Sequence, residues 1–428
     1  MDEDGSVLTE SNKSDKKDSD TRFGVYRGWS VVAGGFVGAF VVFGLTYTFG
    51  VFLEPMQREF GLTRSGISLV FSLQTLVVYV GAAILGVAAD RYGVRPLLVV
   101  GTVLFAVGGI WTAYADTYAG VLVAYGVLTA VGLGAIYVVS YATVPRWFQR
   151  RRGLAAGIAT AGLGVGMVVL PPAASVLIEA AGWRAALLVL VVASTLAVLA
   201  VVPLFADDPA SAGVATGREF REGPPEFGAT DWTTYRREVA AVATSRPFLL
   251  VFVGWVFVYA TMYVVLVHMV PHAGEIGLGE RTGALALAVI GATTGLARIG
   301  VGGLSDRLGR VRTFVVCAAG MALATTALSL VETTVGLFAV AVGFGICYGG
   351  NGALLSPLTV DLFGAANPNA ILGLVSLSFA VSGLFAPWAA GVVFDATGGY
   401  GPAFVGVGLI GLGGAGLVAT AGRLAEGE

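Results

Sequence analysis

The sequence predicts an all-α membrane protein with twelve transmembrane helices in two pseudo-symmetric halves of six. Three observations support this fold class: the composition, the number of apolar runs of membrane-spanning length, and an internal repeat. Of the 428 residues, 56% are hydrophobic and 12% are charged, and the mean hydropathy is +0.83. This composition provides too little polar surface for a water-soluble domain. The lipid bilayer is therefore the expected surrounding.

Twelve apolar runs, each about 20 residues long, can cross a hydrocarbon core of roughly 30 Å. The N-terminal six-helix bundle is expected at 29–206, with spans at 29–52, 66–89, 96–115, 118–140, 153–180 and 184–206. The C-terminal six-helix bundle is expected at 247–421, with spans at 247–271, 282–304, 313–331, 334–357, 369–394 and 401–421.

The segments outside these bundles are polar. Residues 1–28 and 422–428 are predicted to be cytoplasmic tails, and no apolar core of a cleavable signal precedes the first span. Residues 207–246 are rich in proline, glycine and mixed charge, which predicts a cytoplasmic linker between the bundles. The positive-inside rule sets this orientation. The connections after spans 2, 4 and 8 carry Arg91, Arg95, Arg146, Arg150, Arg151, Arg152, Arg307, Arg310 and Arg312. We expect a multi-pass protein of the cell membrane with both termini in the cytoplasm.

An internal repeat relates the two halves. Gly61 and Gly277 are 216 residues apart, and the same shift repeats a Gly-x-x-x-Asp-Arg-x-Gly motif without a gap. The shift places Gly61, Leu62, Gly86, Asp90, Arg91 and Gly93 on Gly277, Leu278, Gly302, Asp306, Arg307 and Gly309. Two parallel six-helix repeats follow from this match.

The repeated motif carries a family resemblance. The stretches GVAADRYGVR (86–95) and GGLSDRLGR (302–310) resemble the signature between helices 2 and 3 of major facilitator superfamily transporters, and its echo between helices 8 and 9. Five further stretches are similar to the monocarboxylate transporter group and its prokaryotic oxalate/formate relatives. They are GWSVV (28–32), TYTFGVFLEPM (46–56), RWFQRRRGLAAGIATAGLGVG (146–166), AGWRAAL (181–187) and VDLFG (360–364).

The resemblance implies a secondary active transporter whose halves expose a central site to each side in turn. It also implies a cytoplasmic gate in the repeated motif, where glycines let two helices approach and the Asp-Arg pair is a latch. The gate residues would be Gly86, Asp90, Arg91, Gly302, Asp306 and Arg307. The simpler interpretation is a tight turn whose arginines only fix the topology.

Arg298 is the main candidate for substrate binding. It lies eight residues before Asp306 and thus roughly 12 Å inside the apolar run, where a charge costs several kcal/mol unless it is paired. The spans contain no carboxylate at comparable depth, since Glu332, Asp361 and Asp395 are near helix ends. We expect the substrate, a small organic anion, to supply the missing charge, because a guanidinium binds a carboxylate through two parallel hydrogen bonds. In the resembled family an arginine of helix 8 has this role, and ARIGVGGL (297–304) aligns with it. A structural arginine is the alternative.

The chain departs from the family at three positions. Animal-type monocarboxylate transporters have an aspartate four residues before this arginine, where this chain has Thr294, and a lysine in helix 1, which aligns near Tyr47. The oxalate-type relatives have a lysine in helix 11, where this chain has Phe379. A single cation favours a monocarboxylate over a dicarboxylate. The coupling partner stays open between a proton, sodium and a counter-anion. The alternatives are an oxalate/formate-type dicarboxylate exchanger and a transporter-derived sensor that does not transport.

Five other polar residues are weaker candidates. Tyr47, Tyr137, Asn351 and Gln74 are predicted to contact the substrate, although helix packing, interface belts or interhelical hydrogen bonds explain such residues nearly as well. His268 is predicted to carry a coupling proton or to act at an outer gate.

Several classes of function are not expected. Cys317 and Cys347 both lie in apolar runs, so neither a disulfide framework nor a metal cluster is predicted, and no cofactor is expected. The sequence has no Walker lysine, nucleophile elbow or carboxylate pair at glycosidase spacing. We expect neither an enzyme nor a nucleic-acid partner, and we expect a monomer.

Overall fold

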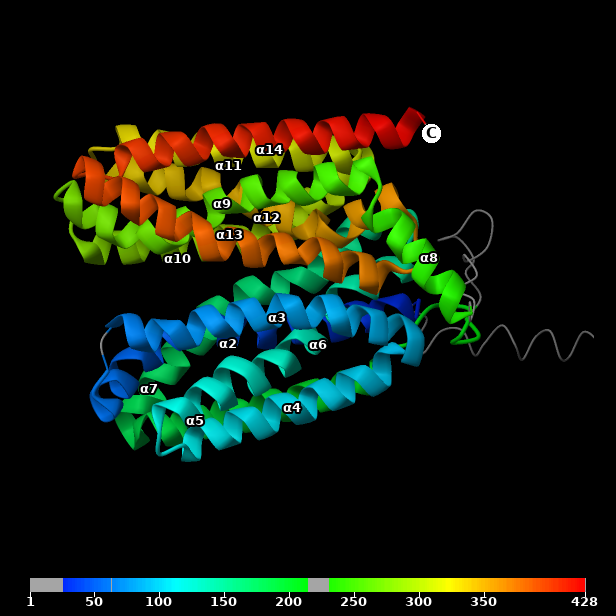
Figure 1. The fold of residues 1–428 in the computed structure, drawn as a ribbon, viewed down its shortest axis with the longest axis horizontal. Coiled ribbons are helices and arrows are strands. Elements are labelled where there is room, and N and C mark those ends of the chain that lie inside the picture. Colours follow the sequence, from blue (N-terminus) through cyan, green and yellow to red (C-terminus); the bar gives the residue numbers. More distant parts are fainter. Residues whose placement is uncertain (1–25, 63, 215–230, 428) are drawn as a thin grey trace, which may run out of the picture.

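The computed structural model describes residues 26–62, 64–214 and 231–427, and the regular elements of this part of the chain are all helical. Figure 1 shows two elongated bundles lying one above the other, with α2 to α7 in the lower bundle and α9 to α14 in the upper one. The predicted all-α fold with two six-helix halves is confirmed.

The N-terminal bundle follows the first six predicted spans. Its elements are α2 (Gly28–Phe60), α3 (Arg64–Tyr92), α4 (Val94–Tyr114), α5 (Tyr118–Val123), the π-helical turn η2 (Ala124–Thr129), α6 (Ala130–Ala142), the 3-10 turn η3 (Val144–Trp147), α7 (Arg152–Val201) and the 3-10 turn η4 (Val202–Leu204). The segments α5, η2 and α6 follow one another directly and form one span.

The C-terminal bundle follows the other six spans. Its elements are α9 (Arg246–Glu275), α10 (Glu280–Leu308), α11 (Arg310–Ala327), the 3-10 turn η5 (Leu328–Leu330), α12 (Thr334–Phe363), α13 (Pro368–Thr397) and α14 (Gly401–Gly427). Several helices exceed the predicted spans, because polar residues continue the helix beyond the apolar run.

Eleven segments of the described chain are long and apolar enough to cross a membrane, and one of them, Arg152–Leu204, contains two spans. It breaks at Gly182, whose φ of 81° is a conformation that favours glycine. Beyond the break, Arg184 donates a hydrogen bond to the Ala113 carbonyl at the end of α4. At the start of α4, Arg95 donates to the Phe205 carbonyl. The chain therefore reverses at Gly182 and runs antiparallel to α4, which gives twelve spans.

The predicted linker contains a helix that the sequence did not indicate, α8 (Trp232–Ala243). The Arg91 guanidinium of α3 lies 4.7 Å from the Trp232 ring centroid. Asn367, which precedes α13, donates a hydrogen bond of 3.1 Å to Glu238. Helix α8 thus contacts both bundles at one end of the molecule (Figure 1), which we call the linker end.

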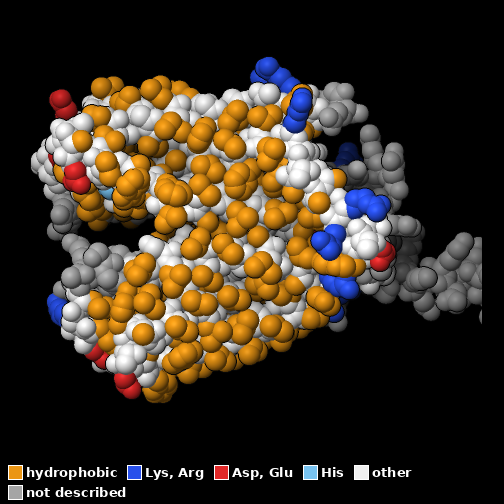
Figure 2. Space-filling view, in the orientation of Figure 1, with side chains coloured by type: hydrophobic (Ala, Val, Ile, Leu, Met, Phe, Trp, Pro, Cys, Tyr) orange, Lys and Arg blue, Asp and Glu red, His pale blue; other side chains and the backbone are white. Residues whose placement is uncertain are grey.

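The repeat is also present in the turns between consecutive helices. Gly93 between α3 and α4 and Gly309 between α10 and α11 have φ values of 90° and 89°. These turns lie at equivalent positions, since 309 minus 93 equals the repeat length of 216. Most of the arginine side chains visible on this face lie at the linker end, and the surface is hollowed between the bundles at the opposite end (Figure 2).

Candidate functional site

The bundles meet at the linker end through Asp90 of α3. Its carboxylate accepts hydrogen bonds from the backbone N–H of Ala370, at 2.9 Å, and from the Asn369 side chain, at 2.7 Å. Both donors lie in the first turn of α13, where the helix dipole favours an anion. Arg146 of the same bundle forms an ion pair with Asp90 at 2.6 Å. Asp90 therefore joins its own bundle to the other one.

Asp306 of α10 makes the equivalent contact in the other direction. It accepts hydrogen bonds from the backbone N–H groups of Gly153 and Leu154, at 2.9 and 3.0 Å, in the first turn of α7. The docked pairs are related by the repeat, since 306 minus 90 and 370 minus 154 both equal 216. The two aspartates therefore form two repeat-related contacts between the bundles, and we refer to these contacts as the latches.

Asp361 of α12 extends the second latch. It forms an ion pair with Arg152 of α7 across the bundles and another with Arg310 of α11, both at 2.6 Å. Arg310 in turn binds Asp306 at 2.7 Å. The network links three helices of the C-terminal bundle to α7.

The glycines of the predicted gate lie at close helix crossings. A methyl group on Gly86 would meet the Asn369 carbonyl at the start of α13, and one on Gly302 would meet the Gly153 carbonyl at the start of α7. These residues are again 216 apart, so both crossings depend on glycine in the same way. The two arginines of the predicted gate do not contact the latch aspartates: the Arg91 guanidinium packs over the Trp232 ring, and the Arg307 side chain is exposed. The latches contain the aspartates without these arginines.

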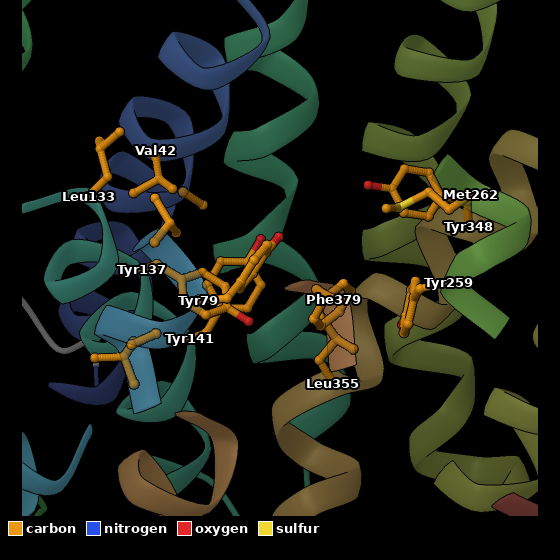
Figure 3. Close-up of a cluster of buried hydrophobic side chains, with 14 of the residues drawn as sticks. Val42, Tyr79, Leu133, Tyr137, Tyr141, Tyr259, Met262, Tyr348, Leu355 and Phe379 are labelled. Atoms are coloured by element: carbon orange, nitrogen blue, oxygen red, sulfur yellow. The ribbon is translucent and has the colours of Figure 1, made fainter. Parts of the chain in front are cut away.

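Between the bundles, a pocket contains Arg298 as its charged side chain. Its lining comes from eight helices: Phe43, Tyr47, Tyr79, Tyr137, Tyr141, Leu163, Tyr259, Met262, Arg298, Tyr348, Gly352, Leu355 and Phe379. Figure 3 shows Tyr79 and Tyr137 on one side and Tyr259, Met262 and Tyr348 on the other. The Tyr79 and Phe379 rings stack across the bundles at 5.1 Å. The pocket is thus an aromatic chamber with one cation.

Arg298 is 2% exposed and has few partners. Its Nη1 atom donates to the Tyr141 hydroxyl at 3.5 Å, its Nε atom has no hydrogen-bond partner, and its guanidinium carbon lies 5.9 Å from the Tyr348 ring centroid. The ion pairs found in the described residues do not include Arg298. Among the described residues, the guanidinium of Arg298 thus has a long hydrogen bond to a hydroxyl and no ion pair.

Glycines hold the arginine in place. Gly157 of α7 lies against the Arg298 carbonyl, and Gly352 of α12 lies against the guanidinium, so that a methyl group at either position would overlap Arg298. In the repeat-related crossing, Gly373 of α13 makes the same close approach to the Ala82 carbonyl of α3 in the N-terminal bundle. Because 298 minus 82 and 373 minus 157 both equal 216, Ala82 is the repeat mate of Arg298. The backbone is symmetric here, but the positive charge is on one bundle.

The other predicted contact residues lie in three settings. Tyr47 and Tyr137 line the arginine pocket, and the Tyr137 hydroxyl is 2.9 Å from Ser376 Oγ of the other bundle. Gln74 lines an adjoining pocket that also contains Tyr47. Asn351 is buried but donates to Met321 of α11 and is outside both lining sets.

His268 lies away from the arginine, within the C-terminal bundle. Its Nε2 atom is 3.1 Å from the Pro387 carbonyl of α13, and its ring lies 4.9 Å from that of Tyr400. His272, one turn later, has its Nε2 atom 3.1 Å from the Leu328 carbonyl and its Nδ1 atom 3.4 Å from Glu275. Neither histidine lines the two pockets.

Sequence reasoning missed most of the tyrosines. Seven of the fourteen tyrosines line the two pockets: Tyr47, Tyr79, Tyr137, Tyr141, Tyr259, Tyr263 and Tyr348. One available signal was the repeat, because Tyr47 and Tyr263 are 216 residues apart, as are Phe43 and Tyr259. An aromatic residue at the same depth in both repeats indicates a shared central face.

The family comparison decides what kind of molecule this is. The family model described as Major Facilitator Superfamily matches residues 35–387 and, again, 265–426. The chain belongs to the major facilitator superfamily. As a member of this family it is a membrane-embedded, multi-pass transporter of small molecules and not an enzyme, as predicted.

Individual relatives agree with this assignment. The chain is 28% identical to "Monocarboxylate transporter 11" of Homo sapiens over 88% of this chain and 79% of that protein. It is 27% identical to "Monocarboxylate transporter 13" of Rattus norvegicus over 92% and 88% of the two chains. The predicted resemblance to monocarboxylate transporters is thereby confirmed.

Solved structures support the fold. The proton:xylose symporter XylE superposes with a TM-score of 0.71 at 15% identity, covering 91% of this chain and 94% of that one. The transporter FucP, in its outward conformation, superposes with a TM-score of 0.69 at 14% identity, covering 91% and 97%. At these identities the match concerns the twelve-helix fold.

Proposed function

We propose that this transporter carries a small organic anion, a monocarboxylate, and that Arg298 binds its carboxylate. The observation that carries the proposal is a fully buried guanidinium between the bundles with no carboxylate partner in the described chain. Its Nε and Nη atoms form the planar fork that receives a carboxylate through two parallel hydrogen bonds. Monocarboxylate transporters among the relatives support the same substrate class.

Tyrosine hydroxyls would complete the carboxylate site. Tyr141 already contacts the guanidinium, and Tyr47 and Tyr137 line the same pocket. Neutral hydroxyls donate hydrogen bonds without adding charge, so the site keeps a net charge of one. A single cation favours a monocarboxylate over the dicarboxylate of the alternative exchanger hypothesis, because a second carboxylate would be buried without a partner. Asn351 and Gln74, which do not line the arginine pocket, remain weaker candidates for contacts to the substrate.

Transport is proposed to follow alternating access. The two aspartate latches close the linker end, and the surface is hollowed at the opposite end (Figure 2). We place the linker end in the cytoplasm, because its arginines obey the positive-inside rule. We also propose that both termini are cytoplasmic, that the protein resides in the cell membrane, and that it is a monomer. The described state then faces outward. Opening of the latches would expose Arg298 to the cytoplasm.

The coupling partner is proposed from what the site contains. Neither pocket is lined by a carboxylate or a histidine in the described chain, so these pockets supply no protonatable group of ordinary acidity beside Arg298. The absence of such a group among the described lining residues favours exchange of the substrate against a second anion. It also favours cotransport in which a proton or sodium ion moves together with the bound substrate. His268 remains a candidate for proton transfer at the outer end of α9. The sensor alternative predicts binding without transport.

The test is uptake of labelled anions into proteoliposomes under imposed proton and sodium gradients. The panel contains acetate, lactate, pyruvate, formate, oxalate and longer aromatic monocarboxylates. We expect one or more monocarboxylates to accumulate and Arg298→Gln to abolish uptake. The matched control is Arg312→Gln, which removes a charge from an exposed arginine of α11 and should leave uptake intact. Unchanged uptake in Arg298→Gln would reject the role of Arg298, and accumulation of oxalate alone would favour the dicarboxylate exchanger.

A further inference from the structure

A second pocket adjoins the one that contains Arg298. Its lining residues are Val42, Phe43, Thr46, Tyr47, Phe71, Gln74, Thr75, Val78, Tyr79 and Tyr263. Phe43, Tyr47 and Tyr79 line both pockets, so the two spaces share an aromatic wall. No described residue lining this second pocket is charged. It therefore differs in chemistry from the arginine pocket beside it.

The second pocket contains polar groups without partners. Gln74 is fully buried, and the Tyr125 hydroxyl is close enough to interact with one atom of its side-chain amide, which leaves the other atom without a partner. The hydroxyl of Thr75, the next residue in α3, is also buried without a partner. Buried amides and hydroxyls are normally hydrogen-bonded, because an unsatisfied group costs about 1–3 kcal/mol. The remaining amide atom and the Thr75 hydroxyl are thus available to a neutral polar group in the second pocket.

The repeat gives the distance between the two polar ends. Ala82 of α3 is the repeat mate of Arg298, so the two residues lie at the same level along the bundles. Gln74 lies eight residues before Ala82, which is roughly 12 Å along α3 toward the opposite end. A three-carbon acid is only about 5 Å long, given carbon–carbon bonds of about 1.5 Å. The distance of roughly 12 Å separates backbone positions along the helix axis, and the arginine side chain covers part of it. A longer acid fits better than a three-carbon acid along the aromatic wall that joins the two pockets.

We propose that the two pockets are one elongated site whose substrate is a monocarboxylate with a neutral hydrogen-bonding group at its far end. The carboxylate binds Arg298, and a distal hydroxyl, carbonyl or amide binds Gln74 and Thr75. The body between these groups packs on Phe43, Tyr47 and Tyr79, which favours a flat or aromatic scaffold. This inference rests on the proposed function and adds the length and the distal group of the substrate.

The test compares the affinities of three acids for the purified full-length protein, by displacement of a bound reporter acid. The probes are 3-(4-hydroxyphenyl)propanoate, its unsubstituted analogue 3-phenylpropanoate, and lactate. We expect the hydroxyl acid to bind about tenfold more tightly than the unsubstituted acid, as for one or two well-formed neutral hydrogen bonds. Lactate should be the weakest ligand. Equal or tighter binding of lactate would overturn the proposal.

Variants assign the preference to the second pocket. Gln74→Leu should reduce the preference for the hydroxyl acid to about twofold or less, and Thr75→Val, a smaller change, should reduce it partially. Thr102→Val is the control, since Thr102 is a buried threonine of α4 that donates to the Leu98 carbonyl and lines neither pocket. It should retain the preference. A preference that persists in both Gln74→Leu and Thr75→Val would overturn the proposal, even if one of them folds poorly.

The same assay separates the two claims. If Arg298→Gln loses affinity for all three acids while Gln74→Leu leaves the ratio between the aromatic acids unchanged, only the elongated site is wrong. If Arg298→Gln binds all three acids as the wild type does, the proposed function fails, and the elongated site fails with it. Loss of all binding in Arg298→Gln, together with loss of the ratio in Gln74→Leu, supports both.

Discussion

Arg298 carries a positive charge that nothing in the described chain neutralises, and this charge has a cost in the substrate-free protein. Burial of an ion destabilises the folded state by several kcal/mol when no opposite charge compensates for the lost hydration. Two helix crossings built on glycine position the residue, since Gly157 lies against its backbone carbonyl and Gly352 against its guanidinium. A residue that is held at such a cost is more consistent with binding than with structural support.

Replacement of this arginine by an apolar residue separates the two roles. We expect Arg298→Met to raise the melting temperature of the substrate-free protein by about 2–5 °C, because an unpaired buried charge is removed and most of the side-chain volume is kept. Anion uptake should be lost in the same variant. The measurement is thermal unfolding in detergent. A clear fall in melting temperature would instead identify Arg298 as a structural residue.

Gly352 should control the position of the guanidinium. A methyl group there would overlap the guanidinium nitrogens, so Gly352→Ala should displace the fork and reduce the affinity for monocarboxylates by about tenfold or more. Gly343→Ala is the matched control, because Gly343 is on the same helix and has open space around it. The readout is the substrate dissociation constant. Equal affinities in the two variants would show that the close packing of Gly352 against the guanidinium does not affect substrate binding.

At the scale of helices, the two latches depend on aspartates that each dock on the first turn of a helix in the opposite bundle. Asp90 and Asp306 use the same backbone geometry on α13 and α7. Their surroundings differ, since Asp90 pairs with Arg146, whereas Asp306 shares Arg310 with Asp361. The second latch belongs to a larger ion network. The contribution of each to closure can therefore be measured separately.

Neutralising either aspartate should favour opening at the linker end. In Asp90→Asn and in Asp306→Asn the side chain loses the charge that binds the helix N-terminus, at a cost of about 1–3 kcal/mol to the closed state. Spin labels at the repeat-related exposed positions Tyr92 and Leu308, in a background without Cys317 and Cys347, report the distance between the bundles. We expect a larger population at long distance. Asp395→Asn, in an exposed residue away from the latches, is the control, and an unchanged distribution in both latch variants would contradict the role assigned to them.

The helices themselves could be predicted better than their contacts. The length of apolar runs determined all twelve spans, and the chain reversal near Gly182 was expected at the gap between 180 and 184. Helix α8 was missed, because its residues are too polar for a span and its packing on Arg91 and Asn367 is tertiary. The gate motif singled out Asp90 and Asp306, but the docking of Asp90 on α13 could not be predicted, because it depends on a residue 280 positions away.

At the scale of the whole molecule, a symmetric scaffold surrounds an asymmetric site. The repeat relates the turns, the latches and the helix crossings, yet Arg298 on one bundle corresponds to Ala82 on the other. The proposed role of Arg298 could be predicted from the sequence, because burying an isolated charge in an apolar run has a large free-energy cost. The aromatic chamber could not, because tyrosines such as Tyr79 and Tyr348 occur in helix packing as often as in binding sites, and only the fold brings them together.

The most direct test of the central claim is equilibrium binding of a transported monocarboxylate and of its neutral primary amide, in the wild type and in Arg298→Gln. The two ligands have nearly the same shape and differ in charge. We predict that the wild type binds the acid at least about tenfold more tightly than the amide, as for hydrogen bonds to a charged group, and that this preference disappears in Arg298→Gln. Equal binding of acid and amide by the wild type, or an unchanged preference in the variant, would contradict the claim that Arg298 binds the substrate's carboxylate.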